Sequence, residues 1–77
     1  MDITITDVML HIDEDLDKDH RNQLESYMRG QEGIVSLGYH EKRPHLMVVG
    51  YNPECITSMD ILTSIQTQGV HAELIGL

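Results

Sequence analysis

The order of the apolar patterns is the strongest constraint on the fold, because strand, helix and strand follow one another twice within 77 residues. Four segments have the alternating or continuous apolar character of strands: 5–12, 34–39, 46–51 and 70–74. A helical pattern separates the strands of each half, and the polar stretch 40–44 predicts a hairpin turn between the halves. The sequence therefore predicts an α+β ferredoxin-like βαββαβ fold. Its two helices would cover one face of a four-stranded antiparallel sheet of order 4-1-3-2.

Both helices carry recognisable start signals. Asp17 suits the N-cap of the first helix, because its carboxylate can accept hydrogen bonds from free backbone N–H groups. In that helix Leu24 and Met28 share one face at i, i+4. The segment Thr57–Asp60 resembles a capping box for the second helix, whose inward residues are predicted to be Ile61, Leu62 and Ile65.

The size of the chain favours a single domain, residues 1–77, that binds a partner or ligand and is not an enzyme. A domain of this length buries roughly 60% of the surface of its unfolded chain, which leaves too few walls for a deep active site. The serines show no nucleophile signature, and the acidic first loop has the wrong sign for binding a phosphate.

Charge excludes further classes of partner. Thirteen Asp and Glu residues against five Lys and Arg give a net charge of −8, which argues against nucleic acid. Such acidity suits a divalent cation or a basic protein, although solubility alone accounts for it more often. No apolar run of about 18 residues predicts a membrane span, and Met1 to Thr4 lack the features of a signal peptide. With Cys55 as the single cysteine, we expect a cytoplasmic protein.

Three segments resemble the heavy-metal-associated domain, the fold of small copper chaperones and of the N-terminal domains of metal-pumping ATPases. They are Gly33–Leu37, Val48–Pro53, and the pattern from Ile61 to Ala72 that includes Gly69-Val70-His71. The resemblance covers nearly the whole chain. It implies the βαββαβ fold and a role in binding or transporting metal.

The family's Met-x-Cys-x-x-Cys loop is absent from this sequence. Matching the family's helix and strand pattern puts its two cysteine positions at Asp17 and His20. Cu(I) prefers sulfur ligands, whereas imidazole and carboxylate suit Zn(II), Ni(II), Cu(II) or Co(II). The resemblance thus implies metal handling, and the residues argue against Cu(I).

The five histidines belong to segments that the predicted topology brings to one edge: the end of strand one, the start of helix one, the hairpin, and the start of strand four. Strand four lies roughly 14 Å from strand two, so one ion cannot bind all five rings. Two subsets are open: His11, His20 and His71 with Asp13 or Asp17, or His40 with His45. We predict Asp17 and His20 as the first ligands, with His11 and His71 next.

A role without metal is the alternative. Asp17 would then be only a helix cap, and Cys55 a bystander thiol. If Val8, Leu10 and Ile12 face the helices, an open sheet face could dimerise or bind a protein partner. The residues predicted to form that face are Met9, His11, Met47, Val49 and Tyr51.

Overall fold

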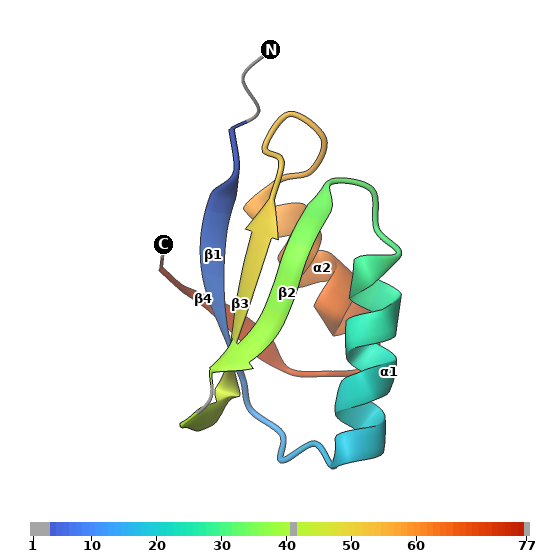
Figure 1. Ribbon diagram of the computed structural model, residues 1–77. Helices are drawn as coiled ribbons and strands as arrows, with labels where there is room; N and C mark the ends of the chain where they lie inside the picture. The colour runs from blue at the N-terminus through green and yellow to red at the C-terminus, as the bar shows by residue number, and fades with distance from the viewer. Residues whose placement is uncertain (1–3, 41, 77) are drawn as a thin grey trace.

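The computed structural model describes residues 4–40 and 42–76, and its elements follow the predicted βαββαβ order (Figure 1). The strands and helices are β1 (Thr6–Ile12), α1 (Lys18–Arg29), β2 (Ile34–His40), β3 (Arg43–Tyr51), α2 (Ser58–Thr67) and β4 (Ala72–Gly76). The strands form one sheet in the order β2-β3-β1-β4, with every neighbouring pair antiparallel. The predicted fold class and strand order are therefore confirmed.

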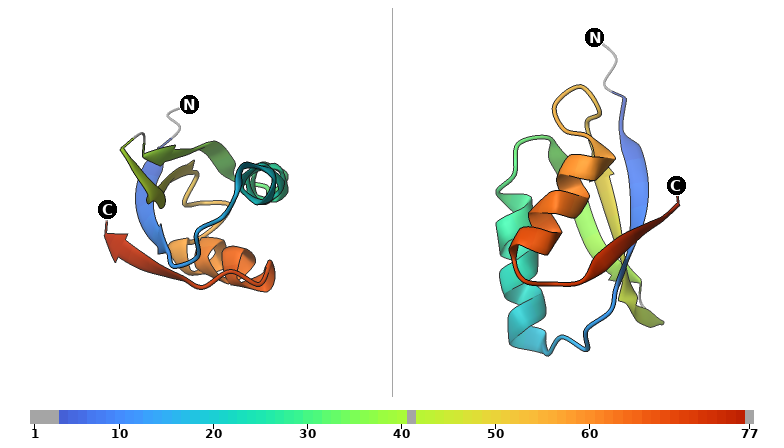
Figure 2. Two further views of the ribbon diagram at one scale, coloured as in Figure 1. Left: turned by 90° about the horizontal axis from the view of Figure 1, so that it is seen from below. Right: turned by 180° about the vertical axis from the view of Figure 1, so that it is seen from behind.

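Both helices lie on the same face of the sheet, and no described helix or strand covers the opposite face (Figure 2). Helix α1 begins where Asp17 accepts a hydrogen bond from the backbone N–H of His20 at 2.8 Å, so the predicted N-cap is confirmed. Helix α2 begins with the predicted capping box, because Thr57 and Asp60 exchange side chain–backbone hydrogen bonds of 3.1 Å.

The core lies between the helices and the inner face of the sheet. Leu24 and Met28 of α1 and Ile61 and Ile65 of α2 are buried against the strands, as their helical spacing predicts. From the strands, β1 contributes Val8, Leu10 and Ile12. Because each helix presents one apolar stripe to the sheet, these side chains form one contiguous core.

The predicted orientation of β3 is wrong. Met47 and Val49 are fully buried and Tyr51 is almost so, whereas the sequence placed all three on the open face. In the β1–β3 ladder Leu10 pairs with Met47 and Val8 with Val49, and directly paired residues point to the same face. Strand β3 is apolar on both faces, so alternation alone could not determine which face is buried.

The open face of the sheet consequently carries a different set of residues. It contains Met9 and His11 from β1 together with their partners Val48 and Leu46 from β3. At the other edge, β4 adds Glu73, which pairs with His11, and Ile75, whose side chain is 46% exposed.

Several strand boundaries also differ from the predictions. β3 begins at Arg43, three residues before the predicted start, so the turn is shorter than 40–44, and Glu41 lies outside the described residues. β4 begins at Ala72, two residues after the predicted start. A register shift between Ile34 and Ser36 leaves Val35 57% exposed, although the alternation placed it beside Leu37.

Candidate metal site

Segment 13–17, which we call the acidic loop, joins β1 to α1 at one end of the molecule. The β2–β3 hairpin and the start of β4 lie at the same end (Figure 1). The backbone N–H of Asp13 donates to the carbonyl of His71 at 2.9 Å, which fixes the loop to the chain entering β4. Cys55 lies in the exposed connection between β3 and α2, at the opposite end, as predicted.

Each of the four acidic side chains of the acidic loop contacts a different histidine. The Nδ1–carboxylate distances are 3.1 Å for His11–Asp13, 2.8 Å for His71–Glu14 and 2.7 Å for His20–Asp17, and Nε2 of His45 lies 2.8 Å from Asp15. These histidines come from β1, α1, β3 and the segment before β4. The loop is therefore surrounded by imidazole rings from four parts of the chain.

Three of the rings share one tautomer. A carboxylate is only an acceptor, so the ring nitrogen that contacts it must carry hydrogen. For His11, His20 and His71 that nitrogen is Nδ1. When these rings are neutral, Nε2 keeps its lone pair, and a carboxylate behind Nδ1 is the usual support of a metal-binding histidine.

His45 differs, because both of its ring nitrogens face acceptors. Nδ1–H donates to the carbonyl of Ile12 at 2.7 Å, while Nε2 faces the carboxylate of Asp15 at 2.8 Å. Its ring stacks on that of His11 with centroids 5.7 Å apart and planes inclined by 16°. His45 therefore positions the acidic loop and His11, and it has no free nitrogen for an ion.

In the alternative pair of His40 with His45, each ring has contacts of its own. His40 lies at the end of β2, and its Nδ1 accepts a hydrogen bond from the backbone N–H of Lys42 at 3.2 Å. His45 is held by Ile12 and Asp15, so both of its ring nitrogens are occupied as positioned, and the pair stays a prediction.

The acidic loop changes the pKa of its paired groups. The side-chain hydrogen bond with Glu14 raises the pKa of His71, and the same bond lowers the pKa of Glu14. Hydrogen bonds from the backbone and then the side chain of His20 lower the pKa of Asp17. Each effect favours the charged form of its group.

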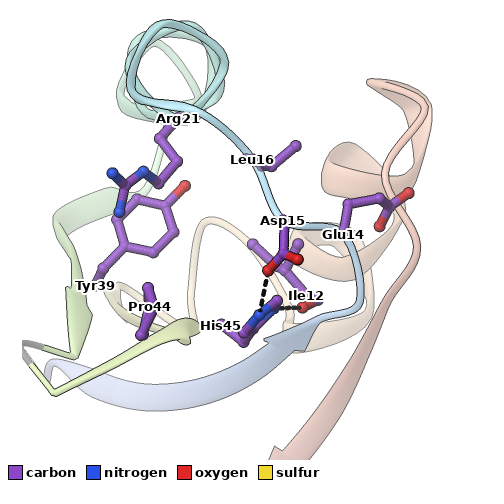
Figure 3. Close-up of a pocket in the computed structure, with 8 residues that line it drawn as sticks. All are labelled: Ile12, Glu14, Asp15, Leu16, Arg21, Tyr39, Pro44 and His45. Atoms are coloured by element: carbon purple, nitrogen blue, oxygen red, sulfur yellow. Dashed lines mark hydrogen bonds and ion pairs between the residues drawn. The ribbon is translucent and has the colours of Figure 1, made fainter.

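A small cavity of about 180 Å³ lies behind the acidic loop, between α1 and the hairpin (Figure 3). The Arg21 guanidinium lies 5.8 Å from the centre of the Tyr39 ring on one side, and the Asp15–His45 pair forms the other. The Tyr39 hydroxyl is buried without a hydrogen-bond partner among the described residues, and burial raises the pKa of Tyr39 to about 12. The cavity is therefore lined by paired charged groups and one unpaired hydroxyl.

One group of three possible metal ligands is close enough to share an ion. Among residues 4–40 and 42–76, only His11, Asp13 and Glu73 offer three ligand atoms that all lie within 4.8 Å of one another. Of the four predicted ligands, Asp17 and His20 are in contact with each other, His11 belongs to this group, and His71 contacts Glu14. The four do not assemble into one cluster as positioned, so their joint role stays a prediction.

Sequence reasoning missed Glu14, Asp15 and Glu73 as partners of the histidines. The pairing of His11 with Glu73 across two strands could have been found from the strand order, had the register been known. Glu14 and Asp15 had no signal of their own, because their partners are distant in sequence.

Comparison with solved structures identifies the class: the chain has the fold of the heavy-metal-associated domain. The N-terminal domain of a potential copper-translocating P-type ATPase from Bacillus subtilis, solved in the Cu(I)-loaded state, matches 95% of this chain and 90% of its own, with a TM-score of 0.83 and 18% identity. A copper binding domain from HMA7, a P-type ATPase, matches 91% of this chain and 93% of its own, with a TM-score of 0.81 and 16% identity.

A third match has a similar TM-score and a lower sequence identity. Oxidized MerP from Ralstonia metallidurans CH34 covers 92% of this chain and 97% of its own, with a TM-score of 0.79 and 10% identity. No protein-family profile and no curated protein sequence matches the chain. At these identities the likeness establishes the fold alone.

Among the described residues, no helix is long enough and apolar enough to cross a membrane.

Proposed function

We propose that this chain binds a divalent transition-metal ion, such as Zn(II), Ni(II), Cu(II) or Co(II), at the end of the molecule that carries the acidic loop. The observation that supports this function is the set of three carboxylate-supported histidines, His11, His20 and His71, each with Nε2 free of a partner among the described residues. Asp17 is the fourth proposed ligand, because it contacts His20. Imidazole nitrogen with carboxylate oxygen is a donor set that divalent ions of this class accept.

The same residues do not fit Cu(I). Cu(I) requires soft sulfur ligands, and the only cysteine of the chain lies at the far end of the molecule. Met28 and Met47 are fully buried in the core. The matched domains named for copper therefore support metal handling by this fold, while the donor atoms here favour a divalent ion.

The exposure of the proposed ligands favours binding and transfer over catalysis. His20 and His71 are open to solvent, so an ion there would exchange readily with another protein. An exposed site also lacks the water-excluding walls that acid–base catalysis needs. We propose a metal carrier or binding domain in the cytoplasm, not an enzyme.

An NMR titration of tag-free protein tests this function. Zn(II), Ni(II), Co(II) and Cu(II), and Cu(I) under reducing conditions, are added while the ¹H–¹⁵N spectrum is recorded. We expect the resonances of Asp17, His20, His11 and His71 to move together when a divalent ion is added. The shifts should saturate at about one equivalent.

Two variants separate specific binding from attraction to the acidic surface. His20→Ala should weaken binding. His40→Ala removes a histidine at the same end that has no supporting carboxylate among residues 4–40 and 42–76, and it should leave binding unchanged. Shifts that scatter over all acidic residues without saturation would contradict the proposed function.

The open sheet face supports a second candidate, a protein-interaction or dimerisation module. Its residues Met9, Leu46 and Val48 are partly exposed, and Ile75 is 46% exposed, which makes this face more apolar than a monomer needs. For a dimer, sedimentation equilibrium should give twice the chain mass, and Val48→Lys should return the monomer mass. A monomer at all concentrations would exclude self-association.

A further inference from the structure

We propose that the divalent ion is held by His11, Asp13 and Glu73, at the junction of β1 and β4 on the open face of the sheet. This inference rests on the proposed function, since it presupposes that the chain binds such an ion. It differs in the site, because only His11 belongs to the four ligands predicted from the sequence. Asp17 and His20 then keep only their structural role as a helix cap.

The distances between the ligand atoms fit a single ion. Nδ1 of His11 lies 3.1 Å from Oδ1 of Asp13 and 3.8 Å from Oε1 of Glu73. Metal–ligand bonds of about 2.0–2.1 Å in tetrahedral or octahedral geometry place neighbouring ligand atoms about 2.8–3.4 Å apart. Small side-chain rotations therefore suffice to bring one nitrogen and two oxygens onto one ion.

The backbone already fixes the relative positions of the three ligands. His11 and Glu73 are directly opposite each other in the β1–β4 ladder, and Asp13 follows the last residue of β1. The Asp13 N–H bond to the His71 carbonyl, 2.9 Å long, holds the end of that ladder. The His11 ring is also stacked on the His45 ring, which is held by hydrogen bonds to Ile12 and Asp15. The side chain of His11 therefore needs little further ordering when an ion binds.

The charge and exposure of the three side chains determine which class of ion they can bind. Two carboxylates and a neutral imidazole compensate a 2+ ion, and one nitrogen with two oxygens suits Zn(II), Co(II), Ni(II) or Cu(II). The side chains of His11, Asp13 and Glu73 are 39%, 59% and 68% exposed, so water can complete the coordination. The basic Arg43 lines the shallow hollow beside His11 and should weaken the attraction of a cation.

The chemistry at His11 also distinguishes this site from the one proposed at the acidic loop. Here the ion occupies the position of the hydrogen between Nδ1 and Asp13, so Nδ1 becomes the ligand and the proton of the neutral ring moves from Nδ1 to Nε2. The loop site uses Nε2 in every histidine. The ring nitrogen that responds to metal therefore identifies the site.

The decisive experiment is a titration with Zn(II). Calorimetry measures the affinity, and the ring ¹⁵N resonances of the histidines show which nitrogen binds the ion. In the wild-type protein the ¹⁵N resonance of His11 Nδ1 should shift more than that of His11 Nε2. Glu73→Gln should weaken Zn(II) binding tenfold or more, because it removes one charged ligand. Glu54→Gln, which makes the same exchange at an exposed position after β3, should change affinity less than twofold.

Arg43→Gln should change Zn(II) affinity in the opposite direction to Glu73→Gln. It removes the positive charge beside His11 without touching a ligand, so Zn(II) should bind more tightly by about twofold to fivefold. The ¹H–¹⁵N spectrum of each variant establishes that it remains folded.

The outcomes separate the two proposals. Unchanged affinity in Glu73→Gln, with binding lost in His20→Ala, overturns this assignment and leaves the proposed function intact. Absence of saturable binding in the wild-type protein overturns both. Equal losses in Glu73→Gln and Glu54→Gln would mean that net charge attracts the ion, which also overturns the assignment.

Discussion

Four largely exposed histidine–carboxylate pairs surround the acidic loop. Exposed ion pairs of this kind are individually weak, because water competes for both partners. Their arrangement matters more than their strength. The carboxylates fix the tautomers of His11, His20 and His71. Of these, His20 is the residue that the sequence resemblance predicted at a cysteine position of the family.

The His71–Glu14 pair predicts a pH-dependent contribution to stability. The raised pKa of His71 means that its contribution is present below its ordinary value of 6.5 and is lost as the pH rises through the folded-state value. The lowered pKa of Glu14 means that its contribution is present above its ordinary value of 4.5 and is lost as the pH falls through its folded-state value. Both contributions coexist between these two ordinary values.

Glu14→Gln should therefore lower the melting temperature most between about pH 4.5 and 6.5, and less at pH 8 or pH 3. Thermal unfolding in the presence of EDTA measures the difference from wild type at each pH. Glu32→Gln, an exposed change outside the acidic loop, serves as the control. A difference that stays constant over the whole range would show that the ionisation of the pair does not contribute to stability.

Among the elements, the orientation of β3 decides which of its side chains lie in the core and which lie on the open sheet face. One face of this strand completes the core, and the other forms the centre of the open sheet face. A shift of the register by one residue would exchange the two faces and would move Met47 out of the core. The paired residues of β1 prevent this, because Val8 and Leu10 are themselves buried beneath the helices.

The orientation of β3 is tested by two truncations in neighbouring positions. Met47→Ala should lower the free energy of unfolding by about 2–5 kcal/mol, because it leaves a cavity in the core. Leu46→Ala, on the open face, should cost about 1 kcal/mol or less. Urea denaturation of both variants measures the difference. A larger loss for Leu46→Ala would mean that the faces are reversed.

At the scale of the whole molecule, a net charge of −8 over 77 residues dominates the electrostatics. Repulsion among like charges opposes the compact state, and dissolved salt screens it over about 10 Å at 0.1 M ionic strength. The histidine–carboxylate pairs offset part of this repulsion only when the histidines are protonated.

Added salt should therefore stabilise the protein at pH 8. Raising sodium chloride from about 10 mM to 0.5 M should raise the melting temperature by a few degrees, since about 1 kcal/mol corresponds to roughly 4–8 °C for a domain of this size. Differential scanning calorimetry measures the change. A fall in melting temperature would show that attractive ion pairs outweigh the net repulsion.

The local patterns of the sequence determined the elements and their order. The helix starts at Asp17 and Thr57 were predictable, because a cap forms between residues three positions apart. The contact between Asp17 and His20 was predictable for the same reason. The inward faces of both helices follow from the spacing of their apolar residues, and the strand order follows from the βαββαβ pattern.

Only the tertiary structure decided the face of β3 and the partners of the acidic loop. A strand that is apolar on both sides has no alternation to orient it, so its pairing with β1 fixes the buried face. Glu14 and His71 lie 57 residues apart, and His45 lies 33 residues from Ile12. Contacts of such separation depend on the register and twist of the whole sheet, whereas caps and helix faces depend on a few neighbouring residues.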